Sequence, residues 1–365
     1  MNLILIFLLT IIIFEILFRV TYFFKNKKKY KNKKKVLFSK IHYESHPYLP
    51  FKLKKNFKNS GEIEVNYPLK KKYKFVSPSL ISNNLGFYNG NNGDRNIDDD
   101  KKNKIRVNCL GGSTTMNYLK DNENNISYPI QLQKKLDKFN KDKFEVNNLG
   151  QGLYNSTDIL VSFITNTIYT KPDIIILYIG YNDIRSYLTN NFNTDHSHSR
   201  KNLNFRQFQK FLNYIAYDFN LNFLNYIFSK FGIYNIKESL TYEISKGEFN
   251  LGNDPKKGLE VFHQNIEILI SICKSKNIRL IMSSFCHNLY DELKNDELHI
   301  KFHQIVNKEN EILRDLAKKN DVEFVDNNLM LKKNNDLFVD TIHFSKEGMD
   351  MIAENFYKQI ISQKN

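Results

Sequence analysis

Four short segments of this sequence carry the residue types that acyl transfer through a serine ester requires. They contain a hydroxyl nucleophile, glycines with accessible backbone N–H groups, a side-chain amide and an Asp–His pair: Gly111-Gly112-Ser113-Thr114-Thr115, Gly150-Gln151-Gly152, Gly180-Tyr181-Asn182-Asp183 and Asp340-Thr341-Ile342-His343. A serine hydroxyl is a poor nucleophile until a neighbouring base takes its proton, and that base needs a third group to orient it. Donors must also face the oxyanion that forms during attack. The four segments together supply each of these parts.

Taken singly, each segment has a structural explanation. Gly-Gly-Ser is a common turn, Asn182 can cap a turn, and an Asp-x-x-His sequence can be a surface pair. The order of the segments along the chain favours chemistry, because each of the first three directly follows a run of strand length.

The strand-length runs alternate with helix-length segments from Ile105 onward. The strand-like runs are Ile105–Leu110, Phe144–Leu149, Ile174–Ile179, Ile278–Ser283 and Val322–Val325. Helical periodicity covers Ser127–Phe139, Ser156–Ile168, Gly258–Lys276, Phe302–Lys319 and Lys346–Ser362. This alternation predicts an α/β domain with a five-stranded parallel sheet and helices on both faces. Ligands of such sheets bind at the carboxyl ends of the strands, where the first three segments lie.

The four segments resemble the sequence blocks of the SGNH/GDSL hydrolase superfamily. Gly-Gly-Ser113-Thr-Thr is similar to the nucleophile block, Asn148 to Gly152 to the glycine block, Gly180-Tyr-Asn182-Asp183 to the GxND block, and Asp340-Thr-Ile-His343 to the DxxH block. The similarity extends over about residues 105–358. One departure is that the glycine block is a residue shorter than the usual N-x-G-x-x-G.

The resemblance implies a flavodoxin-like three-layer α/β/α fold and a Ser113–His343–Asp340 triad. It also implies an oxyanion hole formed by the Ser113 N–H, the Gly152 N–H and the Asn182 side-chain amide. Because the glycine block is short, Gly152 is chosen over Gly150. This chemistry needs neither a metal nor an organic cofactor.

The N-terminal segment predicts a transmembrane helix over residues 1–24. Leu3 to Phe24 is apolar except for two threonines, Glu15 and Arg19, and as a helix it is long enough to span about 30 Å of hydrocarbon. The first alanine is Ala216, so no A-x-A site for a signal peptidase precedes it. We therefore expect a membrane protein with a single N-terminal anchor.

The sequence does not decide on which side of the membrane the hydrolase domain lies. Eight lysines between Lys25 and Lys35 follow the helix and favour a cytoplasmic domain by the positive-inside rule. Membrane-attached relatives in the superfamily favour a periplasmic or extracellular one. Residues 25–104 are interpreted as a basic juxtamembrane segment and lead-in region, and residues 105–365 as the hydrolase domain, with a helical insertion at about 185–254.

Other partners are less well supported. Eight of the positive charges behind the net charge of +15 come from that lysine run. The chain also has no RNP motif or zinc-finger spacing, so no nucleic-acid partner is expected. His196 and His198 stand in a polar loop, where they are expected to be solvated rather than to bind metal. His287 follows the fourth strand and is a candidate for lining the pocket.

The function predicted from the sequence is hydrolysis of a carboxylic or acyl ester through an acyl-enzyme. One alternative is an O-acyltransferase or deacetylase acting on a glycan or lipid, because water and a sugar hydroxyl can use the same triad. A second is an inactive membrane-bound scaffold, against which the complete triad argues. The expected substrate is an ester-bearing small molecule, lipid or glycan.

Overall fold

The computed structural model describes residues 3–25, 43–44, 46–57, 63–66, 74–77, 82–88, 96–98, 101, 103–117, 120–121, 124–190, 192–196, 198, 249–331 and 334–362. The chain divides into two units. One comprises Met1–Phe51 and Arg200–Glu243, and the other comprises Lys52–Ser199 and Ile244–Asn365.

The larger unit is built on a five-stranded parallel sheet, as predicted. Its strands are β5 (Ile105–Gly111), β8 (Phe144–Asn148), β9 (Ile174–Tyr178), β10 (Arg279–Ser283) and β11 (Glu323–Val325). Their order in the sheet is β11-β10-β9-β5-β8, and every pairing is parallel. β5 lies beside the middle of the sheet, and the register places its last residue, Gly111, opposite Tyr178 of β9. Residues that follow β5 and β9 therefore meet at one edge.

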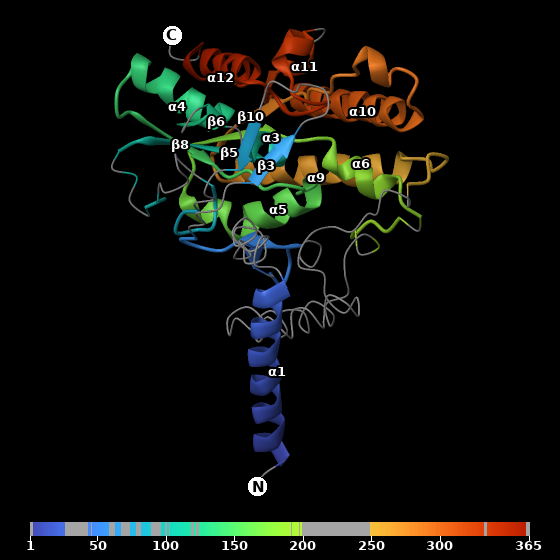
Figure 1. Cartoon of the computed structure of the whole chain (residues 1–365). Coiled ribbons are helices and arrows are strands. Elements are labelled where there is room, and N and C mark those ends of the chain that lie inside the picture. Colours follow the sequence, from blue (N-terminus) through green and yellow to red (C-terminus); the bar gives the residue numbers. More distant parts are fainter. Residues whose placement is uncertain are drawn as a thin grey trace. The chain divides into compact units, whose positions relative to one another are not determined.

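Helices cover both faces of this sheet. The main ones are α4 (Tyr128–Phe139), α5 (Ser156–Thr165), α9 (Lys256–Ser275), α10 (Glu297–Asn320) and α12 (Lys346–Ile361). Figure 1 shows α4 and α12 on one side of the sheet and α5 and α9 on the other. This arrangement follows from the strand order. The chain moves across the sheet in one direction from β5 to β8, through α4, and in the other direction in the later connections, which contain α5 and α9. Because crossovers between parallel strands are right-handed, connections that run in opposite directions place their helices on opposite faces.

Side-chain caps set where three helices begin. Asn155 and Asp158 form a reciprocal capping box at the start of α5, and the Ser345 side chain caps α12. α10 begins at Glu297, five residues before the predicted start, because the Asp296 carboxylate accepts the backbone N–H of His299. The hydrophobic period alone missed this first turn, since it carries few apolar residues.

Short elements connect or precede these. Those in the described part of the chain include α3 (Ser113–Met116), α6 (Asn182–Tyr187) and α11 (Asn327–Leu331), the 3₁₀ turns Thr167–Thr170, Asp291–Leu293 and Asn335–Leu337, and the strands β2 (Lys52–Leu53), β3 (Ile63–Asn66), β4 (Lys74–Ser77), β6 (Lys120–Asp121) and β7 (Asn124–Asn125). β3 and β4 pair antiparallel, as do β6 and β7. In the described part of the lead-in region, the Gly86 carbonyl accepts a hydrogen bond from the side-chain amide of Gln151, in the glycine block, at 3.1 Å.

The smaller unit contains α1 (Leu3–Lys25) and β1 (Tyr43–Glu44). Among the described residues, no helix has both the length and the apolar character needed to cross a membrane, so the predicted single-pass anchor, and the localisation based on it, were wrong. Glu15 and Arg19 interrupt the apolar run, and the uncharged part from Leu3 to Phe14 falls short of the ~20 residues that a span requires. Residues 26–35, most of the lysine run behind the topology prediction, lie outside the described residues, as does the insertion between 199 and 248.

Candidate active site

Ser113 stands at the sharp turn between β5 and α3. The turn depends on two glycines. A Cβ at Gly111 would lie 2.1 Å from Thr115 Oγ1 and 2.4 Å from the Tyr178 carbonyl oxygen, and one at Gly112 would lie 2.6 Å from Asn182 Nδ2. No side chain fits at Gly111, because the Tyr178 oxygen belongs to the backbone, and a side chain at Gly112 would displace the Asn182 amide. The glycines thus let the residues after β5 pack directly against the end of β9 and bring Ser113 beside Asn182.

Ser113, His343 and Asp340 form a continuous hydrogen-bond chain. His343 Nε2 lies 2.9 Å from Ser113 Oγ, although the two residues are 230 positions apart. His343 Nδ1 lies 2.7 Å from Asp340 Oδ2. The other Asp340 oxygen, Oδ1, accepts the backbone N–H groups of Ile342 at 2.9 Å and His343 at 2.7 Å. One carboxylate therefore shapes the turn and contacts the imidazole that the turn presents.

The same contacts set the charge state of Asp340. Burial alone would raise its pKa, but the charge of His343 and the hydrogen bonds from His343 and Ile342 together hold the pKa below the usual aspartate range. Asp340 is thus ionised at neutral pH, which favours a proton on the Nδ1 side of His343 and leaves Nε2 to accept from Ser113.

Asn182 begins α6 and points its amide toward the same place. Its Nδ2 donates to the Tyr154 carbonyl at 2.9 Å and packs over the Gly112 α-carbon. A carboxamide carries two N–H groups, so this bond fixes the amide and leaves the second N–H for a ligand oxygen. Sequence reasoning identified Asn182 but missed Tyr154, which carries no motif signal because its contribution is a backbone carbonyl.

The glycine block packs against α3. The Gly152 N–H is directed at Met116 Sδ, 3.3 Å away, and the Gly150 N–H at Asn148 Oδ1, 3.1 Å away. A Cβ at Gly150 would lie 2.4 Å from the Met116 nitrogen, so this glycine is required for packing against α3. Neither glycine is among the described residues that line the cavity at Ser113.

That cavity is small. Its volume is about 10 Å³, enough for one water-sized group, and ten residues line it: Gly112, Ser113, Thr114, Tyr154, Ile179, Gly180, Tyr181, Asn182, Phe285 and Ile342. They come from the ends of β5, β9 and β10, from the segment before α5 and from the Asp340–His343 turn. The bulky members of this wall are Tyr154, Ile179, Tyr181, Phe285 and Ile342.

The remaining histidines are placed differently from one another. His196 is fully buried, with Nδ1 3.2 Å from Asn155 Nδ2, so the expectation that it is solvated was wrong. His198 Nε2 lies 3.1 Å from the Ser186 carbonyl oxygen. His287 is buried, stacks on Tyr181 with ring centroids 5.7 Å apart, and shares a 2.9 Å Nδ1–Nδ1 contact with His303. Among the described residues, no group of three or more candidate ligands is arranged to hold a metal ion.

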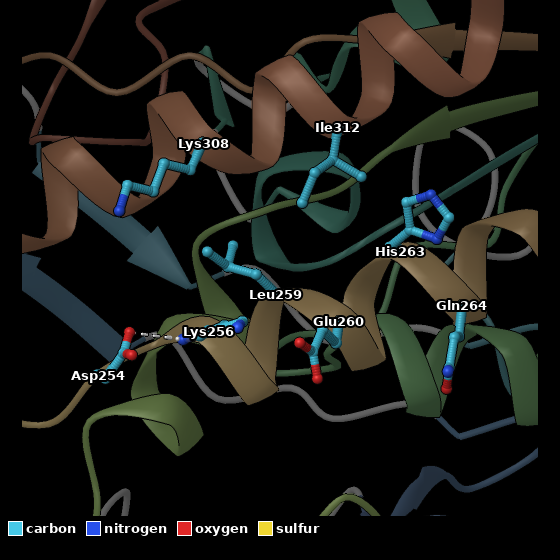
Figure 2. A pocket seen from close by; sticks show the side chains of 8 residues that line it. All are labelled: Asp254, Lys256, Leu259, Glu260, His263, Gln264, Lys308 and Ile312. Carbon is cyan, nitrogen blue, oxygen red and sulfur yellow. Dashed lines mark hydrogen bonds between the residues drawn. The ribbon is translucent and has the colours of Figure 1, made fainter. Parts of the chain in front are cut away.

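A larger hollow lies between α9 and α10, away from these residues (Figure 2). Its volume is about 530 Å³, and its lining mixes charged, polar and apolar side chains: Asp254, Lys256, Leu259, Glu260, His263, Gln264, Lys308 and Ile312. It contains none of the predicted site residues.

Two buried carboxylates lie behind Asn182. Asp183 accepts the Ser156 N–H at 3.0 Å and the Ser156 hydroxyl at 2.5 Å, which ties the start of α6 to the start of α5. Burial raises the pKa of Asp183 to about 7. Glu309 of α10 is fully buried nearby, and burial, followed by the charge of Asp183, holds its pKa well above the usual glutamate range.

Glu309→Gln is expected to flatten the dependence of stability on pH. The folded state keeps a proton on Glu309 that the unfolded state releases above about pH 4.5, so the free energy of unfolding falls as pH rises, by up to ~1.4 kcal/mol per pH unit for this one group. Glutamine mimics the protonated form and removes that slope. Urea denaturation between pH 5 and 8 measures it, with the exposed Glu311→Gln on the same helix as the matched control. Equal slopes for wild type and Glu309→Gln would contradict the assignment.

The geometry defines an α/β protein whose serine, histidine and aspartate meet at the carboxyl edge of a parallel sheet. The model of the GDSL-like Lipase/Acylhydrolase family matches residues 109–351, and the chain belongs to that family. It is accordingly a hydrolase of ester bonds. No curated protein sequence matches the chain.

The solved structures similar to this chain include esterases and an acylhydrolase. An acetyl xylan esterase named AlAXEase is 16% identical, with 70% of this chain and 100% of that chain covered and a TM-score of 0.43. An acetylxylan esterase from Geobacillus stearothermophilus is 15% identical over 70% of this chain and 94% of that chain, with a TM-score of 0.43. A lipase/acylhydrolase from Enterococcus faecalis is 12% identical with the same two coverages and a TM-score of 0.43.

Proposed function

We propose that this protein hydrolyses acyl esters through a covalent intermediate on Ser113. The observation that carries the proposal is the hydrogen-bond chain from Ser113 Oγ through His343 to Asp340, with separations of 2.9 and 2.7 Å. These distances are those of formed hydrogen bonds, so the base is already in contact with the nucleophile before substrate binds.

In the first half of the reaction, Ser113 Oγ attacks the ester carbonyl carbon while His343 Nε2 takes its proton. The carbonyl oxygen becomes an oxyanion, which accepts from the Ser113 N–H and from the second N–H of the Asn182 amide. As the tetrahedral species collapses, the ester C–O bond breaks, and His343 returns the proton to the leaving alcohol. The acyl group remains bonded to Ser113 Oγ.

In the second half, a water molecule attacks the acyl carbon and His343 takes a proton from it. Collapse of this second tetrahedral species breaks the bond to Ser113 Oγ, which regains its proton from His343, and the carboxylic acid leaves. Asp340 orients the imidazole and stabilises the imidazolium in both halves.

Gly152 remains the proposed third oxyanion donor, with one requirement. Its N–H is directed at the Met116 sulfur, a weak acceptor, so the donor has to turn toward the substrate oxygen when the oxyanion forms. Leu153, the next residue, has a φ of 67°, in the left-handed region that non-glycine residues seldom adopt, so this segment already departs from relaxed backbone geometry.

An acyltransferase would use the same first half-reaction and differ only in the acceptor, a hydroxyl in place of water. The experiment that tests the proposal also separates these two. Purified protein is incubated with p-nitrophenyl acetate, with and without a methyl glycoside, and p-nitrophenol, acetate and acetylated glycoside are measured.

Wild type is expected to release acetate, and Ser113→Ala is expected to lose at least about 10³-fold in kcat. Acetylated glycoside formed in preference to acetate would favour the transferase. Ser113→Ala that keeps wild-type activity would refute the proposal.

A further inference from the structure

The cavity at Ser113 limits the acyl group that can be attached there. In an acyl-enzyme, the carbonyl carbon bonded to Ser113 Oγ carries one oxygen and one substituent. The oxygen is held between Asn182 and the Ser113 N–H, so the substituent has to fit the space that remains. The space open to the centre of a water-sized group beside Ser113 is about 10 Å³, so about one such group fits there, and a methyl group is close to a water molecule in size.

The wall formed by Phe285 is firmly held. Its ring stacks on Tyr178 with centroids 5.1 Å apart and on Tyr181 with centroids 6.5 Å apart. Its backbone N–H donates to Asn310 Oδ1 at 2.6 Å, and its carbonyl accepts from Asn310 Nδ2 at 2.9 Å. Asn310 is itself 2% exposed, so this side-chain clamp lies inside the domain.

Phe285 is also in close contact with Gly180, another residue that lines the cavity. A Cβ at Gly180 would lie 2.8 Å from both Cβ and Cγ of Phe285, so the ring already touches the backbone of the turn that leads to Asn182. The ring cannot shift toward Gly180 without moving that turn.

Ile342, the second wall residue, is hydrogen-bonded to a residue of the proposed triad. Its backbone N–H donates to Asp340 Oδ1, and it directly precedes His343 in the chain. The residue is 8% exposed and lines the cavity. Moving it outward would disturb the turn that holds His343 against Ser113.

We propose that Ser113 accepts acetyl groups in preference to longer acyl chains, with Ile342 and Phe285 setting the length limit. This inference rests on the hydrolase function proposed above. A longer substituent has to displace a wall that is packed on its far side or tied to Asp340. A mismatch of one methylene in an apolar pocket typically costs about 10-fold or more in kcat/KM.

The test compares the p-nitrophenyl esters of acetate, butyrate and octanoate, with Ser113→Ala subtracted as background. For wild type, kcat/KM is expected to fall at least about 10-fold from acetate to butyrate and further to octanoate. Ile342→Ala enlarges the cavity and should raise the butyrate-to-acetate ratio about 10-fold. Phe285→Leu, which keeps an apolar residue on the Asn310 clamp, is the second variant and should raise the same ratio.

Leu337→Ala is the matched control, because Leu337 is equally buried but is not among the residues that line the cavity. It should leave the ratio unchanged. A wild type that cleaves octanoate as well as acetate would overturn the length limit and leave the hydrolase function standing. A wild type that cleaves none of the three esters would overturn the hydrolase function and this inference with it.

Discussion

Asp340→Asn is expected to lower kcat about 10⁴-fold while leaving the fold intact. In the wild type, Asp340 Oδ2 accepts from His343 Nδ1, which leaves Nε2 unprotonated and able to take the Ser113 proton. An asparagine can present its NH₂ group to Nδ1 instead, which favours the imidazole tautomer with the proton on Nε2. That tautomer cannot act as the base.

The substitution isolates the electronic role of Asp340 from its structural one. Asparagine keeps an Oδ1 that can still accept the Ile342 and His343 N–H groups, so the turn should persist. Steady-state kinetics with p-nitrophenyl acetate measures the loss, and thermal unfolding checks the fold. Asp336→Asn, an exposed neighbour on the preceding 3₁₀ turn, is the control. Retention of more than a tenth of wild-type kcat by Asp340→Asn would contradict the proposed triad.

Asn182→Ala is expected to reduce kcat by 10²- to 10³-fold with a smaller change in KM. The amide is held by the Tyr154 carbonyl, so its second N–H is already oriented before the reaction and costs little to reorganise when the oxyanion forms. Because the charge on the oxygen develops mainly in the transition state, removing the donor raises the barrier more than it weakens substrate binding.

The control for this variant is Asn190→Ala, which removes an exposed asparagine just beyond α6. Both proteins should be compared with wild type in thermal unfolding, since the Tyr154 contact is also lost in Asn182→Ala. A fall in kcat of less than about five-fold, with KM and stability unchanged, would remove Asn182 from the oxyanion hole.

The sequence was sufficient for those parts of the site that depend on strand ends. Periodicity identified the strands that Ser113 and Asn182 follow and the helix that the Asp340–His343 pair precedes. A parallel sheet brings the carboxyl ends of its strands to one edge. The contact between Ser113 and His343 was implied by the family resemblance, because sequence spacing alone does not suggest it. The fold class was predictable from the sequence, since β9 is a wholly apolar run typical of a strand buried on both faces.

The directions of individual N–H groups and the partners of buried side chains were not predictable from the sequence. No sequence pattern reveals that the Gly152 N–H is directed at the Met116 sulfur, because the direction of a backbone amide depends on the local dihedral angles. The bond between Asp183 and Ser156, which ties α6 to α5, joins residues 27 positions apart and had no pattern of its own. The burial of His196 reflects packing against Phe192 and Asn155, which overrode the polar character of its neighbours in sequence.

The prediction of a membrane anchor failed for a different reason. Average composition over Leu3 to Phe24 is apolar, but the average hides the two charged residues that shorten the uninterrupted run. In the described part of the chain, the helix that these residues form does not qualify as a membrane span.

The central claim is that Ser113 carries the acyl group, and covalent labelling tests it most directly. A fluorophosphonate reacts with an activated serine and mimics the tetrahedral species, so wild-type protein should gain the mass of one phosphonyl group. Tryptic mass spectrometry should locate that group on Ser113, and labelling should be absent in Ser113→Ala and slowed by at least about 10²-fold in His343→Ala. A label on another residue, or labelling of Ser113→Ala at the wild-type rate, would contradict the account.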